Sequence, residues 1–406
     1  MKTERNYTIE FVRFLFAINF LLIHVYAVVP RVVGAEPPFA SMFDTIIPFM
    51  AFSGFFLMQT FQKNQAKQGE MPASRQAWLY LKTRLISLMP LFVGATLLAV
   101  LGNCLVLQIP LAAWPRYILD IFCEFFGLQI TGIGYGNSFV GAVATRPAGI
   151  AGSMANGPLW FMSGIFVCGY IIYYLLSKHR DLFVGIIAPL SILLYYGSCY
   201  MTDTLPMWTT MHKIGDFAIA SGFLNMFCGM SLGVLMFVAC DRLRGKEWSG
   251  GFKAVLTVAQ VFCTALLMIR TWVSSTSPLY GYLDFGWGVT FLLSTIFTFL
   301  CVFNVDFFTR LPIFSTKLWK TPGRLAMYIY MLHYPIILLV TRAMGITKGM
   351  GDVYLQNINL IFGISVVVSI AAGYAVMKFE QKVLKPWLDS KPWYSKKQRA
   401  LELAAK

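Results

Sequence analysis

Long apolar runs separated by short polar stretches dominate the chain. Ten of these runs are long enough to cross a hydrocarbon core of about 30 Å as helices. They lie near residues 11–29, 41–60, 85–108, 158–176, 182–200, 216–239, 254–272, 282–303, 326–342 and 357–378. The pattern therefore predicts an all-α integral membrane protein with about ten transmembrane helices.

The composition supports a membrane protein and argues against a nucleic-acid partner. Hydrophobic residues make up 57% of the 406 residues and charged residues 13%, whereas soluble domains carry about 25% charged residues. The net charge of +15 would suit nucleic-acid binding in a soluble protein. Here the cations fall between the apolar runs, so we interpret them as topology signals and expect the lipid bilayer, not nucleic acid, as a partner.

The basic residues also predict the orientation. Of the 33 Lys and Arg residues, 25 fall in alternate connections and at the two ends, and seven fall on the other side. By the positive-inside rule both termini are cytoplasmic. We expect a transmembrane domain over residues 1–386, a basic cytoplasmic tail over 387–406, and a first helix that is retained and not cleaved as a secretory signal.

The segment 109–157 is the longest piece predicted on the outer side. Its first half, "RYILDIFCEFFGLQI", has apolar residues at helical spacing, with Asp120 and Glu124 four apart. This favours a helix that lies at the interface or folds back into the bundle. The second half is rich in Gly and Ala and is interpreted as a loop. The eight cysteines show neither C-x-x-C spacing nor pairing with His, so no disulfide and no metal site is expected.

Two titratable residues stand out in the first span. Arg13 and His24 are eleven positions apart, which is about three helical turns, so both face the same way about 16 Å apart. Glu10 is one turn before Arg13 and can pair with it. Arg13 could simply extend to cytoplasmic water while His24 bonds a neighbouring helix. Alternatively, the two residues connect a cytoplasmic anionic group to chemistry at His24.

Two further patterns within the spans have both a packing and a functional interpretation. His333 stands at comparable depth in "LAMYIYMLHYPII", where Pro335 frees helical carbonyls near the imidazole. Ser53 and Gly54 lie inside the second span, where small residues favour close helix packing. No acidic residue is near His24 in the sequence, so nothing specific supports a Ser-His-Asp triad.

Taken in order, these residues resemble the membrane acyltransferase family 3. Glu10, Arg13 and His24 stand where that family has an acidic residue, an arginine and a histidine in its first helix. Further similar stretches are "PFMAFSGFFLM", "ANGPLWFMSG", "GRLAMYIYMLHYP" and "FEQKVLKP", so the resemblance extends from residue 10 to about 386. Two positions depart from the family pattern: Ser87 replaces a second arginine after Arg84, and Ile165 replaces a frequent glutamate.

The resemblance implies transfer of an acyl group, usually acetyl from acetyl-CoA or another acyl-CoA, to a hydroxyl of a carbohydrate or small acceptor. On this basis Arg13, Arg84 and, in place of the missing arginine, Lys82 are expected to hold the donor. His24 is expected to act as a general base or transient acyl carrier. Arg13 and His333 are the other catalytic candidates, with His333 positioning a helix or the acceptor. The other positions expected to shape the pocket or support the chemistry are Glu10, Ser53, Glu124, Asn156, Trp160 and Tyr330.

The competing hypothesis is a polytopic transporter in which Arg13, His24 and His333 form a proton or substrate path. Such proteins often carry internal repeats with broken helices in matching halves, and the sequence has no obvious repeat. The missing repeat counts against a transporter. The family resemblance implies instead an acyltransferase of a bacterial cytoplasmic membrane that modifies cell-envelope glycans.

Overall fold

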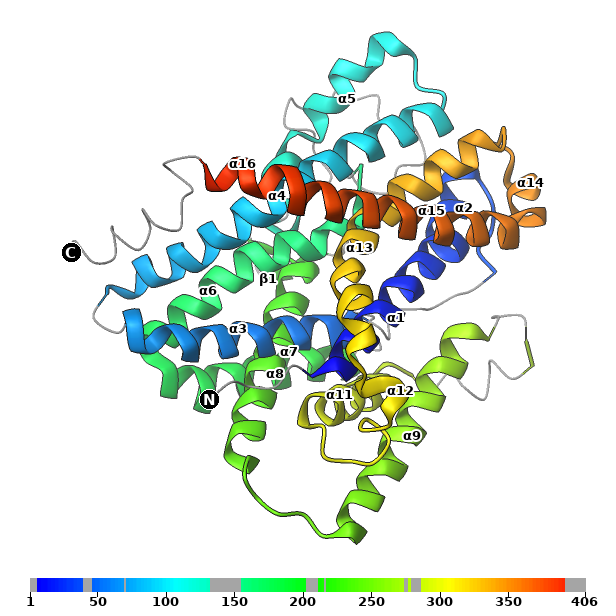
Figure 1. The fold of residues 1–406 in the computed structure, drawn as a ribbon. Helices are drawn as coiled ribbons and strands as arrows, with labels where there is room; N and C mark the ends of the chain where they lie inside the picture. Colours follow the sequence, from blue (N-terminus) through cyan, green and yellow to red (C-terminus); the bar gives the residue numbers. More distant parts are fainter. Residues whose placement is uncertain are drawn as a thin grey trace.

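The computed structural model describes residues 6–38, 46–68, 71–131, 155–201, 211–214, 217–273, 277–278 and 286–390. Helices dominate these ranges (Figure 1). The long ones are α1 (Tyr7–Ile23), α3 (Ile46–Gln68), α4 (Ala73–Val106), α6 (Trp160–Leu182), α7 (Ala188–Met201), α8 (Ser221–Leu243), α9 (Gly250–Trp272), α11 (Gly286–Phe303), α13 (Lys320–Ala343) and α15 (Ile358–Phe379). Each of the ten predicted apolar runs overlaps one of these helices.

Short elements extend or connect the long helices. They are η1 (His24–Val28), α2 (Val29–Val33), η3 (Leu111–Ala113), α5 (Trp114–Asp120), η4 (Phe122–Phe126), η5 (Gln129–Thr131), η6 (Gly157–Leu159), η7 (Phe183–Ile187), α12 (Pro312–Ser315), η8 (Lys317–Trp319), α14 (Gly351–Gln356), η9 (Glu380–Leu384) and α16 (Lys385–Asp389). The boundary predicted at residue 386 falls within α16, and residues 391–406 of the predicted tail lie outside the described ranges.

Seven helical stretches of the described chain are long and apolar enough to cross a membrane. They are Tyr7–Val33, Ala73–Val106, Gly157–Met201, Ser221–Leu243, Gly250–Arg270, Pro312–Ala343 and Ile358–Trp387. The protein is therefore a multipass helical membrane protein, although the predicted count of ten is only partly matched.

Three features account for the difference between ten and seven. Gly157–Met201 is 45 residues long and contains two predicted spans, with non-helical backbone at His179 between them. The apolar helix Gly288–Phe303 is shorter than the other stretches. Helix α3 has a polar second half, "QTFQKNQAKQ", which lowers its overall hydropathy.

Helix α13 is the centre of the bundle. It packs against α1, α4 and α15, and 83% of the most apolar part of the stretch Pro312–Ala343, which contains α13, is buried. In Figure 1 it passes through the middle of the molecule, next to α1. Pro335 lies inside α13 and lacks the N–H that would bond to the carbonyl of Met331. The Asn156 side-chain amide donates to that carbonyl instead, at 3.4 Å.

Helices α3 and α8 cross in direct backbone contact. A Cβ atom added to Gly54 would lie 1.8 Å from the carbonyl oxygen of Met230, and one added to Gly233 would lie 1.8 Å from that of Ala51. Only glycine permits so close an approach. The packing role predicted for the small residues of the second span is thus confirmed at Gly54.

Two local predictions need correction. Strands β1 (Met211–Ile214) and β2 (Phe217–Ala220) form an antiparallel pair, so β2 replaces the start of the span predicted over 216–239. Gly215–Asp216 is a two-residue hairpin signal, which accounts for the strands. The helix predicted in the first half of 109–157 is broken into α5, η4 and η5, with Gly127 at φ +66° between the last two. The predicted loop over 132–154 lies outside the described ranges.

Candidate active site

Helix α1 carries Glu10, Arg13 and, at its end, His24. The Asn6 side chain caps the helix by accepting a hydrogen bond from the Ile9 N–H at 3.3 Å. The Arg13 guanidinium lies 3.5 Å from the Glu10 carboxylate. The Glu10 side chain is largely buried, whereas that of Arg13 is 28% exposed. At His24 the helix widens into the π-helical turn η1. π-Helical turns are rare in proteins, and those that occur are often at functional sites.

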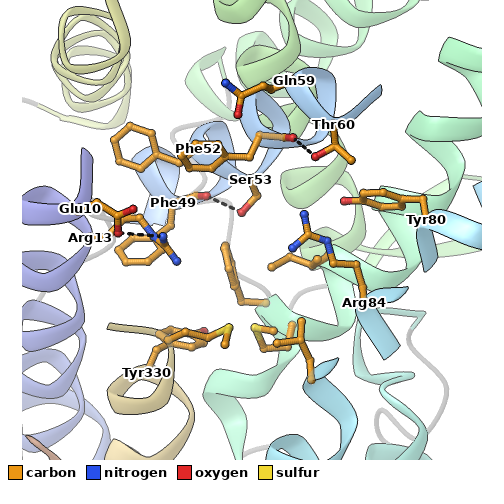
Figure 2. A pocket seen from close by; sticks show the side chains of 16 residues that line it. Glu10, Arg13, Phe49, Phe52, Ser53, Gln59, Thr60, Tyr80, Arg84 and Tyr330 are labelled. Atoms are coloured by element: carbon orange, nitrogen blue, oxygen red, sulfur yellow. Dashed lines mark hydrogen bonds and ion pairs between the residues drawn. The ribbon is translucent and has the colours of Figure 1, made fainter. Parts of the chain in front are cut away.

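A cavity of about 370 Å³ opens beside Arg13. Its wall comes from α1, α3, α4, α6 and α13. Figure 2 shows Arg13 and Arg84 extending into this space from opposite sides, with Ser53 on the α3 wall and Tyr330 on the α13 wall. Among the described residues that line it, only Glu10, Arg13 and Arg84 are charged, so this part of the lining carries a formal charge of about +1 at neutral pH.

Helix α4 presents only one of its two predicted cations to the cavity. Arg84 lines it, with the guanidinium carbon 5.4 Å from the centre of the Tyr80 ring. Lys82 is not among the lining residues. Two residues correspond to a rotation of about 200° on a helix, which explains why the two side chains point in different directions.

The wall formed by α3 is a helical stripe. Phe49, Phe52, Ser53, Phe56, Gln59 and Thr60 all line the cavity. Their spacing of three or four residues is that of one helix face. The Ser53 hydroxyl donates to the Phe49 carbonyl at 2.9 Å. Sequence reasoning identified Ser53 but missed Gln59 and Thr60, although the same periodicity could have located them.

An aromatic cluster forms part of the cavity wall. The ring of Tyr330 stacks on Phe49, with centroids 6.3 Å apart, and packs against Phe161 at 5.5 Å. All three residues line the cavity. The Tyr330 hydroxyl donates to the Pro158 carbonyl. The ring centroid of Phe20 of α1 also lies 5.2 Å from the ring centroids of both Phe49 and Tyr330. Tyr330 thereby connects the cavity to His333, whose ring centroid is 5.7 Å away.

The structure places His24 directly against His333, 309 positions later in the chain. Nδ1 of His24 lies 3.1 Å from Nε2 of His333 and 2.7 Å from the Phe20 carbonyl oxygen. Nδ1 of His333 lies 2.6 Å from the Tyr330 carbonyl oxygen. His333 is fully buried, whereas His24 is partly exposed. Neither imidazole is among the cavity-lining residues. Tyr330 lines the cavity and is in ring contact with His333.

The remaining predicted residues lie in η4 and just before and at the start of α6. Asn156 is fully buried, and its amide donates to the Ala95 and Met331 carbonyls at 3.4 Å each. Trp160 is buried at the first position of α6. The Glu124 carboxyl accepts the Ala155 N–H at 2.5 Å and the Asn156 N–H at 3.3 Å. This geometry gives Asn156 and Glu124 a positioning role at the junction of η4, α4, α6 and α13.

Glu124, which lies outside the seven candidate spans, has a carboxyl group whose pKa is far from its ordinary value. It is 4% exposed, and its burial raises the pKa of the carboxyl to about 8, against the opposing effect of the two backbone N–H donors. Burial disfavours the charged form of an acid. Glu124 is thus substantially protonated near neutral pH.

Comparison with known proteins identifies the family. A family model described as an acyltransferase domain matches residues 6–378, which is nearly the whole chain. The chain belongs to the acyltransferase 3 family, and it is a membrane acyltransferase. Neither the curated proteins nor the solved structures gave a significant match. The family assignment favours the enzyme over the transporter hypothesis.

Proposed function

We propose that this acyltransferase moves an acetyl group from acetyl-CoA to a hydroxyl of a carbohydrate acceptor. One observation carries the proposal: Arg13 and Arg84 extend from two helices into one cavity that is also lined by aromatic side chains. Arg13 also belongs to the same helix as His24, which begins the π-helical turn at the far end.

The two arginines suit the anionic part of the donor. A guanidinium forms bidentate hydrogen bonds with phosphate oxygens and keeps its charge in partly buried surroundings. The net positive lining favours an anion, and the uncharged Gln59 and Thr60 side chains add hydrogen-bonding groups beside it. The aromatic lining residues Phe49, Phe161 and Tyr330 suit the less polar acyl arm.

In the proposed reaction, His24 is the base. Its imidazole accepts the proton of the acceptor hydroxyl while the hydroxyl oxygen forms a bond to the thioester carbon. The carbon–sulfur bond breaks, and the leaving thiolate takes the proton from His24. The ester and free CoA are released, and His24 returns to its neutral form.

The thioester must pass the aromatic cluster to reach His24. Phe49 and Tyr330 line the cavity, and Tyr330 is in ring contact with His333. A rotation of these rings would therefore join the arginine-lined cavity to the histidine pair. We further propose that the acceptor is a cell-envelope glycan of a bacterium and that the protein resides in its cytoplasmic membrane.

The first experiment uses purified protein in nanodiscs. Acetyl-CoA consumption is measured with a panel of lipid-linked and soluble glycans, and the acetylated product is identified by mass spectrometry. His24→Ala should retain acetyl-CoA binding while turnover falls by about 10²–10⁴, the range for loss of a general base. A folded His24→Ala protein with turnover within about tenfold of wild type would contradict the assignment.

A second measurement separates a base from an acyl carrier. Protein incubated with isotopically labelled acetyl-CoA and no acceptor is quenched rapidly and digested. The base mechanism predicts no label on the peptide that contains His24. Label at His24 would replace the base with a covalent acyl intermediate.

A further inference from the structure

The imidazole of His333 has only one neutral tautomer that fits its surroundings. Its Nδ1 lies 2.6 Å from the Tyr330 carbonyl oxygen and 3.2 Å from that of Ile329. Carbonyl oxygens only accept hydrogen bonds, so Nδ1 of His333 must carry the hydrogen. A neutral imidazole has one N–H, which leaves Nε2 of His333 as an acceptor.

The same reasoning then fixes His24. Its Nδ1 faces two acceptors, the Phe20 carbonyl oxygen at 2.7 Å and Nε2 of His333 at 3.1 Å. The hydrogen must therefore be on Nδ1 of His24, shared between the two. The opposite tautomer would place a nitrogen lone pair against the lone pairs of both acceptors. With Nδ1 protonated, Nε2 of His24 carries the free lone pair.

The contacts also fix the plane of the His24 ring. The rings of His24 and His333 are 4.7 Å apart at 67°, and those of His24 and Tyr334 are 5.7 Å apart at 77°. His333 is fully buried and is fixed by carbonyls of its own helix. His24, in contrast, retains some exposure. This asymmetry suits one ring that reacts and a second ring that orients it.

We propose that His333 is a positioning residue that holds His24 in the Nδ1–H tautomer and thereby makes Nε2 of His24 the base. This proposal rests on the proposed function and specifies that Nε2 of His24 is the atom that accepts the proton. The role corresponds to that of the carboxylate that orients the histidine in a serine hydrolase triad, here taken by a neutral imidazole. When Nε2 takes the hydroxyl proton, the Nδ1–H of the resulting imidazolium still donates to Nε2 of His333.

The wild-type tautomer can be measured directly, because the sequence contains only four histidines. Solid-state NMR of protein labelled with ¹⁵N-histidine distinguishes protonated from bare ring nitrogens, and a His24→Ala sample assigns the His24 signals. We expect Nδ1 of His24 to be protonated and Nε2 to be bare. A predominant Nε2–H tautomer at His24 would overturn the proposal without any measurement of activity.

Two amide substitutions at position 333 then test the role of the acceptor. Gln reaches about as far as Nε2 of histidine and can accept the His24 hydrogen bond, whereas Asn reaches only about as far as Nδ1. We expect His333→Asn to lower kcat by about 10- to 100-fold, comparable to loss of a partner that orients a ligand histidine, with the KM for acetyl-CoA unchanged. His333→Gln should restore kcat towards the wild-type value.

The outcomes distinguish this inference from the proposed function. Equal kcat values and equal His24 tautomers in the Asn and Gln variants would overturn the role of His333 alone. An active His24→Ala protein would remove the proposed function itself. If a variant at 333 fails to fold, the wild-type spectrum still decides the tautomer.

Discussion

At the scale of single residues, Arg13 and Arg84 differ in what their loss would leave behind. Arg13 is 3.5 Å from the carboxylate of Glu10, which is 7% exposed. Removing Arg13 would take one cation away from this carboxylate in the cavity wall, which costs stability and makes the cavity less attractive to an anionic ligand. Arg84 lies over the Tyr80 ring, so its replacement is the cleaner test of anion binding.

We therefore predict that Arg84→Ala weakens acetyl-CoA binding by about 1.5–3 kcal/mol, because one hydrogen bond to a charged group is lost. This loss corresponds to a roughly 10- to 150-fold increase in Kd. Arg13→Ala should weaken binding at least as much and also lower the melting temperature. Titration calorimetry with CoA measures both affinities.

Lys82→Ala supplies the matched control for Arg84→Ala, because it removes a cation two positions away on a different face of α4. Its CoA affinity should change less than that of either arginine variant. If Lys82→Ala weakens CoA binding as much as Arg84→Ala does, any cation on this part of α4 attracts the anion, and the cavity itself is not the binding site.

Glu124 predicts a pH dependence of stability. Its folded-state pKa is raised to about 8, above the unfolded value of about 4.3. The contribution of the protonated carboxyl to the free energy of unfolding is therefore fully present below about pH 4.3 and is lost as the pH rises through about 8. The free energy of unfolding falls by at most about 1.4 kcal/mol per pH unit in this range. Glu124→Gln should flatten the fall in melting temperature between pH 5 and 8, as followed by thermal unfolding in detergent. An equally steep fall in the Gln variant would show that another group is responsible.

At the scale of elements, the crossing of α3 and α8 determines where the α3 wall of the cavity stands. Because the backbones touch at Gly54 and Gly233, any added side chain must push the two helices apart. Ser53 and the neighbouring aromatic residues of α3 would move with the helix.

We predict that Gly54→Ala and Gly233→Ala each reduce the yield of folded protein and its melting temperature. The added methyl would lie 1.8 Å from a backbone oxygen, and overpacking typically costs 1–3 kcal/mol or more. Gly94→Ala is the matched control, because a Cβ atom there meets nothing within 4 Å. This variant should be neutral or slightly stabilised by helix propensity. Similar melting temperatures for all three variants would contradict the contact.

The elements could be predicted from the sequence far better than their contacts. Continuous apolar runs located the helices, and Pro335 predicted the free carbonyls near His333. The sequence could not show that Asn156 would donate to the freed Met331 carbonyl 175 positions later. Nor could it show that His333 would contact His24. Such contacts depend on how helices distant in the chain pack, whereas periodicity reports only on neighbours within one helix.

At the scale of the whole molecule, the proposed function requires the arginine-lined cavity to open towards cytoplasmic acetyl-CoA. Helix α4 places constraints on this orientation. Its 34 residues rise by about 51 Å at 1.5 Å per residue, which is enough to cross the membrane. Ser74 near its start and Leu111 just beyond its end should therefore lie on opposite sides.

The distribution of basic residues predicts that Ser74 is cytoplasmic and that Leu111 is on the outer side. Both side chains are exposed, Leu111 by 74%, and the seven cysteines of the described chain are buried. In a Cys123→Ser background, Ser74→Cys and Leu111→Cys are labelled in intact cells with a membrane-impermeant thiol reagent. Leu111→Cys should react before lysis and Ser74→Cys only after it. Labelling of Ser74→Cys in intact cells would place the start of α4 outside and separate Arg84 from a cytoplasmic donor.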